Sequence, residues 1–175
     1  EAVDPPSVVA VDIELAALTG TPPAVGATDA STEQSRAEEL RSQAREASVE
    51  VIASVHDFTA TPPADELVDL LATAATAGDV GKLATTATDH RDALAMLNAT
   101  DQATTAGHRV ATMCMGEPGR HTRAVAPVYG SVIGYAPVVA AEATAPGQYP
   151  LDTLWRLIDG LRGVDDTADR PEPER

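Results

Sequence analysis

Short apolar runs alternate regularly along the chain with segments of helical pattern. Runs rich in β-branched and small apolar residues are expected to form five strands, at residues 8–15, 49–56, 79–84, 109–115 and 130–135. A short run that is apolar on both faces is typical of a parallel strand buried between two layers. The alternation therefore predicts an α/β fold with a parallel sheet and helical crossovers.

Two architectures satisfy this order, namely an open doubly wound sheet and part of a (β/α)8 barrel. No glycine-rich phosphate-binding fingerprint follows the first apolar run, which disfavours the nucleotide-binding version. In both architectures functional residues gather at the carboxyl ends of the strands. Glu14, His56, Lys82 and Met115 fall at or near such ends. Their positions predict a single pocket.

Lys82 is the only lysine of the chain, because the other basic residues among the twelve Lys and Arg are all arginine. An arginine guanidinium stays protonated, whereas a desolvated lysine amine can lose its proton and attack a carbonyl carbon. The alternative interpretation is a structural lysine that extends to solvent from a strand end. His56 is the best acid–base candidate, since an imidazole can take and return a proton near neutral pH. A single histidine at a strand end is nevertheless more often structural.

The composition of the chain limits the classes of partner that it can bind. The 175 residues carry a formal net charge of −15, which argues against binding nucleic acid. Strong acidity with almost no lysine is the composition that we associate with cytoplasmic proteins working in high salt. No apolar run approaches the length of a membrane span, so we expect no membrane partner.

The single cysteine, Cys114, excludes an intramolecular disulfide and a cysteine-cluster metal site. No two histidines have metal-ligand spacing, and we expect neither a metal nor a cofactor. Met113 and Met115 flank Cys114 and share one face of the predicted strand. This face either packs in the core or lines a pocket.

Five motifs, in order and at comparable spacing, resemble those of the type I 3-dehydroquinate dehydratases. The motifs are Ser54-Val55-His56-Asp57-Phe58, Val80-Gly81-Lys82-Leu83-Ala84, Thr112-Met113-Cys114-Met115-Gly116, Arg123 followed by Tyr129-Gly130-Ser131, and Thr144-Ala145-Pro146-Gly147-Gln148. Each motif alone is weak, but the ordered set is specific. The resemblance implies a (β/α)8 TIM barrel, of which this chain holds the last five βα units as an open partial barrel. We expect that domain at residues 1–162 and a disordered acidic tail at 163–175.

The resemblance also implies an activity, the conversion of 3-dehydroquinate to 3-dehydroshikimate and water in the shikimate pathway. Lys82 would form a Schiff base with the C3 ketone of the substrate, and the protonated imine would acidify the C2 hydrogen. His56 would remove that proton and then assist the departure of the C1 hydroxyl as water.

Three further residues are implied to bind the substrate. Arg123 would hold its carboxylate with a fork of N–H donors. Thr144, which stands where the family commonly has serine, and Gln148 would hydrogen-bond the ring hydroxyls or the carboxylate. Asp12 and Glu14 match a recurrent acidic pair, for which we expect supporting work rather than catalysis.

One departure from the family concerns the first part of the barrel. Family members begin with three further βα units, whose strands supply a Glu-x-Arg pair and another Arg and Glu to the site. These have no counterpart here, and five parallel strands cannot close a barrel. We therefore expect an open arc in which Lys82 and His56 keep their placement while substrate binding is impaired.

Two alternatives remain open. The chain could be a non-catalytic piece that is stable only against another chain or against a second copy of itself in a homodimer. It could also be another Schiff-base lyase or a class I aldolase, which would share Lys82 but not the loop at residues 145–148.

Overall fold

The strands form one parallel sheet. The structure is a computed structural model in which residues 8–20 and 30–162 are described. Its strands are β1 (Ala10–Glu14), β2 (Glu50–Asp57), β3 (Val80–Thr86) and β4 (Val110–Met115). They lie in the order β1-β2-β3-β4 with every pair parallel, so the predicted α/β fold with a parallel sheet is confirmed. The predicted tail at 163–175 lies outside the described residues.

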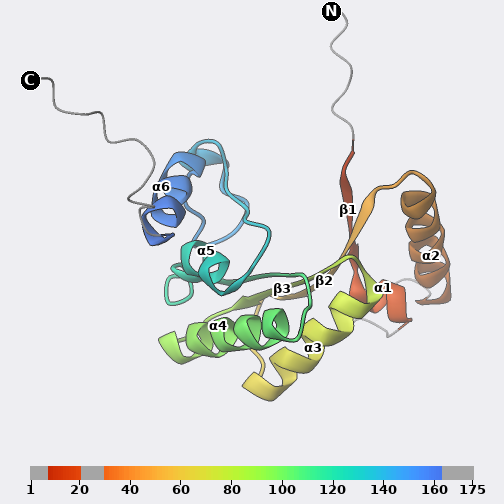
Figure 1. Cartoon of the computed structure of the whole chain (residues 1–175), viewed down its shortest axis with the longest axis horizontal. Coiled ribbons are helices and arrows are strands. Elements are labelled where there is room, and N and C mark those ends of the chain that lie inside the picture. Colours follow the sequence, from red (N-terminus) through yellow and green to blue (C-terminus); the bar gives the residue numbers. More distant parts are fainter. Residues whose placement is uncertain (1–7, 21–29, 163–175) are drawn as a thin grey trace, which may run out of the picture.

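Helices connect the strands and cover one face of the sheet. They are α1 (Leu15–Thr19), α2 (Ala30–Glu46), α3 (Ala64–Ala77), α4 (His90–Thr105), α5 (Thr122–Val125) and α6 (Leu151–Leu161). In Figure 1, α3 and α4 run along the same face of the sheet, whereas α1 and α2 flank β1 at one end and α5 and α6 stand at the other. This is the arrangement of consecutive βα units in a barrel wall.

The two faces of the sheet have different contents because side chains alternate along each strand. On the helix-covered face, Leu83 and Val110 pack with Leu67 and Leu71 of α3, all at most 1% exposed. Burying each leucine contributes about 1.5–3 kcal/mol to folding. The other face has a smaller apolar cluster that includes Ile52. Lys82 and His56 lie on the same face as this cluster, farther along β3 and β2.

The predicted fifth strand at 130–135 is wrong, because residues 131–137 form no strand. The Oγ of Ser131 accepts a hydrogen bond from the Thr112 N–H at 3.0 Å, so a side chain takes a position that a strand backbone would fill. The Val132 N–H does donate to the Val110 carbonyl at 2.9 Å. Pro137 has no N–H with which to continue the pairing. The described sheet therefore has four strands, followed by a segment held beside β4.

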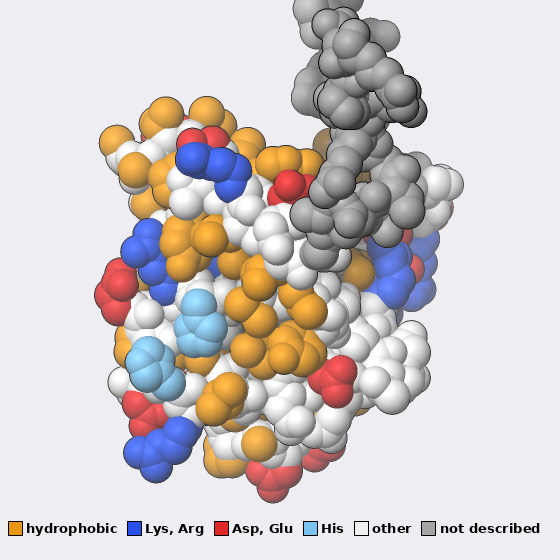
Figure 2. All heavy atoms as spheres, turned by 60° about the vertical axis from the view of Figure 1, so that its left-hand side comes forward, with side chains coloured by type: hydrophobic (Ala, Val, Ile, Leu, Met, Phe, Trp, Pro, Cys, Tyr) orange, Lys and Arg blue, Asp and Glu red, His pale blue; other side chains and the backbone are white. Residues whose placement is uncertain are grey.

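Hydrophobic side chains are exposed at the end of the arc that follows β4. Val132, Leu151 and Trp155 are 51%, 50% and 65% exposed. Figure 2, in which the left-hand side of Figure 1 comes forward, shows such side chains gathered in the middle of this face. A pocket of about 300 Å³ lies between α6 and residues 131–134. Exposed apolar surface of this kind is typical of a contact with another polypeptide segment, as expected for an arc of a barrel.

The start of α4 provides a test of local stability. Asp89 is the N-cap of α4, and its side chain accepts from the Arg91 N–H at 2.7 Å within a capping box. Asp89→Ala should lower the free energy of unfolding by about 1 kcal/mol, because first-turn N–H groups lose their acceptor. Urea denaturation in concentrated salt measures the change. Asp101→Ala, which removes the same charge from the body of α4, should change stability by less than about 0.5 kcal/mol. Equal losses in the two variants would contradict the capping role.

Candidate active site

The Lys82 amine is held on the open face of the sheet by a carboxylate two strands away. Lys82 lies on β3 with its residue 7% exposed, and its Nζ donates to Asp12 Oδ2 of β1 at 2.7 Å. Because β2 lies between β1 and β3, the lysine side chain must cross over β2 to make this contact. The predicted strand-end position of Lys82 is wrong, because β3 continues to Thr86. Lys82 is a buried cation in an ion pair within the strand rather than one that extends to solvent.

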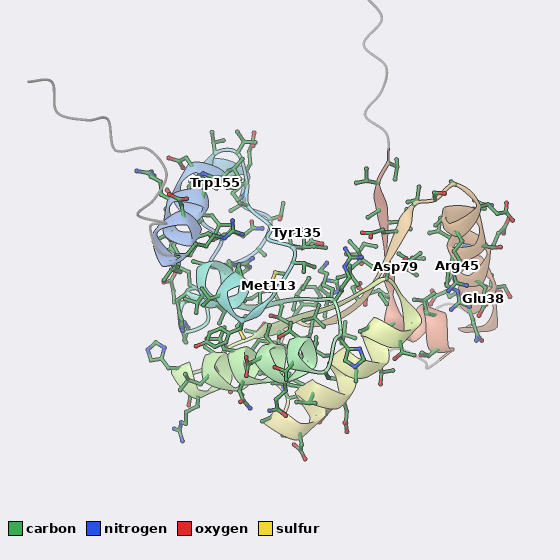
Figure 3. The ribbon with its side chains drawn as sticks, in the orientation of Figure 1. Glu38, Arg45, Asp79, Met113, Tyr135 and Trp155 are labelled. Atoms are coloured by element: carbon green, nitrogen blue, oxygen red, sulfur yellow. The ribbon has the colours of Figure 1, made fainter. Side chains whose placement is uncertain are left out.

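An aromatic ring from the segment after β4 also faces the amine. The centre of the Tyr135 ring lies 4.7 Å from Lys82 Nζ, a cation–π geometry. Figure 3 shows Tyr135 and Met113 on the side of the sheet opposite α3 and α4. The amine is therefore enclosed between a carboxylate and an aromatic face, away from bulk water.

His56, at the end of β2, is oriented by Glu14 of β1. Its Nδ1 lies 2.5 Å from Glu14 Oε1, and its side chain is 22% exposed. The Phe58 ring stacks on the imidazole with the ring centres 5.7 Å apart and the planes within 5°. Since Nδ1 is engaged by Glu14, Nε2 is the nitrogen that remains for proton transfer to a ligand.

Arg123, on α5, is a buried cation that has no acidic partner among the described residues. It is 5% exposed, and none of the ion pairs among residues 8–20 and 30–162 includes it. Its Nη2 donates to the Pro146 carbonyl at 3.4 Å, its Nη1 contacts Met113 Sδ at 3.5 Å, and its Nε has no hydrogen-bond partner there. Burial lowers the pKa of the Arg123 guanidinium, although such a group stays charged in proteins. A buried fork of donors with no counter-charge fits a planar anion such as a carboxylate.

The loop before α6 is tied together by the side chain of Gln148. Its Oε1 accepts from the N–H groups of Thr144 and Ala145 at 2.8 and 3.3 Å, which leaves its NH₂ group for another acceptor. Gly147 has a φ of +79°, and a Cβ there would lie 3.0 Å from the Gly116 carbonyl. The loop therefore needs glycine at 147 to pack closely against the end of β4.

One pocket of about 180 Å³ brings these groups together. The five residues that the sequence predicted for the site all line it: His56, Lys82, Arg123, Thr144 and Gln148. Met113 and Met115 also line it, whereas Cys114 faces the helix-covered core, as their alternation predicted. The pocket has the size and polarity for a small anionic molecule with a carbonyl and hydroxyl groups.

Sequence reasoning did not find the partners of the two key side chains. Asp12 and Glu14 were expected only to support the site, and their contacts with Lys82 and His56 span 70 and 42 residues of sequence. Their i, i+2 spacing on a strand next to β2 was the available signal, because it places both carboxylates on the face that carries His56.

Neither a metal-ligand cluster nor a membrane span is found among the described residues. No three His, Cys, Asp or Glu side chains there are grouped closely enough to hold a metal ion. None of the helices of that part combines the length and the apolarity needed to span a bilayer.

The fold and pocket define a partial (β/α) barrel with a lysine-based site at the carboxyl ends of its strands. A family model described as Type I 3-dehydroquinase matches residues 11–162. The chain belongs to this type I 3-dehydroquinase family.

Relatives and solved structures agree with this assignment. The 3-dehydroquinate dehydratases of Haloarcula marismortui and Haloquadratum walsbyi are 50% and 49% identical over 92% and 89% of the chain. The crystal structure of 3-dehydroquinate dehydratase from Geobacillus kaustophilus is 30% identical and superposes with a TM-score of 0.71 over 87% of the chain. The chain spans 66% and 58% of the two relatives and 53% of the solved chain. The comparison with these longer chains confirms the expected partial barrel.

The buried charge of Arg123 gives a stability prediction. Arg123→Met should raise the free energy of unfolding by about 1 kcal/mol, because a buried cation without a carboxylate costs more than a packed apolar side chain. Arg109→Met is the matched control, since Arg109 forms a half-exposed ion pair with Glu50 at 2.7 Å. This control should lose up to about 1 kcal/mol. Urea denaturation measures both variants, and a clear loss of stability in Arg123→Met would show that the cation is structural.

Proposed function

We propose that this chain carries the catalytic lysine and histidine of a 3-dehydroquinate dehydratase of the shikimate pathway. The observation that carries the proposal is one pocket lined by a buried amine, an oriented imidazole and a guanidinium without a counter-charge. The substrate is 3-dehydroquinate, and the products are 3-dehydroshikimate and water. The family to which the chain belongs supports this choice over other lysine-dependent reactions.

The chemistry begins at Lys82. Its neutral amine attacks the C3 ketone, and loss of water from the resulting carbinolamine leaves an imine whose protonated form withdraws electrons from C2. Asp12, 2.7 Å from Nζ, is placed to accept the ammonium proton and to stabilise the positive charge of the imine. The Tyr135 ring face favours the same charge.

His56 carries out the proton transfers. With Nδ1 held by Glu14, its Nε2 takes the C2 proton to give an enamine and returns a proton to the C1 hydroxyl, which leaves as water. Hydrolysis of the imine then releases the product and regenerates the amine. Glu14 stabilises the imidazolium that exists between the two proton transfers.

The charged and polar groups across the pocket from Lys82 bind the substrate. The Arg123 fork pairs with the substrate carboxylate and thereby gains the counter-charge that the described residues do not supply. The free NH₂ of Gln148 and the hydroxyl of Thr144 meet ring hydroxyls or the carboxylate. Both come from the loop that Gly147 packs against β4.

The length of the chain favours a second candidate function. Because the chain spans 66% or less of the two relatives named above, the second candidate is a piece of an assembly that another segment or a second copy completes. From the family resemblance we expect further substrate contacts in βα units outside this sequence. We therefore propose weak substrate binding by the 175 residues alone, with the lysine chemistry retained.

The setting that we propose is the cytoplasm at high salt. The net charge of −15 and the haloarchaeal relatives support it. Screening at high ionic strength removes the mutual repulsion of a dense carboxylate surface. The same charge supports a small-molecule substrate rather than nucleic acid.

Reductive trapping tests the proposed function. Borohydride added with excess 3-dehydroquinate should attach the substrate irreversibly to the peptide that contains Lys82, because trapping accumulates even a sparsely populated imine. Peptide mass mapping locates the added mass, and Lys82→Arg should abolish it. Added mass on another peptide, or none in the wild-type chain, would remove the imine mechanism.

The histidine variant separates the two chemical roles. His56→Ala should still be trapped on Lys82, while any measured dehydration falls by about 10²–10⁴-fold, as for loss of a general acid–base group. Unchanged dehydration would exclude His56 as the base. Trapping without dehydration in the wild type would favour the assembly-piece candidate.

A further inference from the structure

A buried hydroxyl beside the lysine has no assigned task. Ser54 lies on β2, its residue is 0% exposed, and its Oγ has no hydrogen-bond partner within the described residues. A buried hydroxyl without a partner lowers stability, and native proteins rarely retain one without a reason. A small apolar residue could occupy position 54 of the strand equally well, as Ala53 does at the neighbouring position. The hydroxyl therefore calls for a role that its contacts within the described residues do not supply.

The strand register places this hydroxyl at the centre of the reactive groups. Ser54 pairs with Glu14 on one side and with Lys82 on the other. Residues paired in this way on parallel strands point to the same face of the sheet. Ser54 therefore shares the open face with the amine and with the carboxylate that orients His56.

The path of the lysine side chain adds a second observation. Lys82 reaches Asp12 across β2, and Asp12 pairs with Ile52 while Lys82 pairs with Ser54. The 2.7 Å contact between Nζ and Oδ2 thus closes over the stretch of β2 between these two residues. Ile52 offers no polar atom there. Ser54 is the residue of that stretch whose side chain can hydrogen-bond a nitrogen passing above it.

We propose that Ser54 is a positioning residue for Lys82 during formation and hydrolysis of the imine, a role that rests on the proposed function. Its hydroxyl accepts a hydrogen bond from an N–H of the neutral amine, which turns the nitrogen lone pair toward the ketone. It then donates to the carbinolamine oxygen, which leaves C3 as water when the carbon–nitrogen double bond forms. Ser54 gains and loses no atom, and the bonds made and broken remain those at Lys82 Nζ and the substrate carbon.

A positioning role and a structural role predict opposite changes in melting temperature when the hydroxyl is removed. A hydroxyl kept for packing or stability should reduce the melting temperature when it is removed. A hydroxyl kept for positioning should leave the melting temperature unchanged or raise it, because an unsatisfied buried group is lost, while the lysine reacts more slowly.

The single lysine allows a direct test on the 175-residue chain. The rate at which borohydride traps 3-dehydroquinate on the Lys82 peptide should fall about tenfold in Ser54→Ala, the effect expected for loss of one hydrogen bond. Ser54→Thr, which keeps the hydroxyl, should recover most of the rate. If Ser54→Ala does not fold, Ser54→Cys keeps the size of the side chain without the oxygen and should show the same loss.

Thr100→Val is the matched control for removal of a buried hydroxyl. Thr100 Oγ1 lies 2.7 Å from both Met96 O and Thr112 Oγ1 on the helix-covered side. This variant should melt at a lower temperature and trap at the wild-type rate. Equal trapping rates in Ser54→Ala and the wild type, or a parallel loss of melting temperature and rate as in an ordinary core defect, would overturn the proposal.

A second measurement keeps this result apart from the proposed function. Reductive methylation by formaldehyde and cyanoborohydride reads the reactivity of the Lys82 amine without 3-dehydroquinate. Here too Ser54→Ala should react about tenfold more slowly than the wild type, and equal rates would overturn the role of Ser54. If 3-dehydroquinate is not trapped on the wild-type chain, the proposed dehydratase activity is refuted. The methylation rates still test the role of Ser54 in that case.

Discussion

The contact between Lys82 and Asp12 is the interaction on which the rest of the site depends. It joins the first and third strands across the second, so it exists only if the sheet has the order β1-β2-β3 in the observed register. The same register brings Glu14 to His56. One arrangement of backbone hydrogen bonds therefore positions an amine with its counter-charge and an imidazole with its orienting carboxylate. A one-residue slip of β2 would turn His56 to the helix-covered face and separate it from Glu14.

The site also contains polar groups that the fold alone does not satisfy. The Oγ of Ser54 and the Nε of Arg123 are both buried without a partner in the described part of the chain. Such groups lower stability, and their positions beside Lys82 and in the lining of the pocket fit a site where function is maintained at the expense of stability. In the proposed mechanism the substrate supplies what each group lacks. Its carboxylate meets Arg123, and the carbinolamine oxygen meets Ser54.

The sequence was sufficient for four parallel strands and for five of the residues that line one pocket. Apolar runs alternating with helical segments predicted parallel strands, and the carboxyl ends of those strands converge wherever such a sheet forms. The sequence did not predict the end of the sheet, where one side chain takes the place of a backbone group. Ser131 accepts the Thr112 N–H and so prevents the fifth strand, which no hydrophobic pattern records. The sequence was also insufficient for the pair of Asp12 and Lys82, because a contact across 70 residues depends on register rather than on local pattern.

The central claim is that this arc of the barrel alone fixes the geometry of lysine and carboxylate recognition. A crystal structure of the chain after borohydride reduction with 3-dehydroquinate is the decisive measurement. We expect continuous electron density from Lys82 Nζ to C3 of the bound molecule, with its carboxylate on the Arg123 guanidinium and its C2 facing His56 Nε2. Density that joins the molecule to Lys82 but places the carboxylate away from Arg123, or C2 away from His56, would refute this geometry.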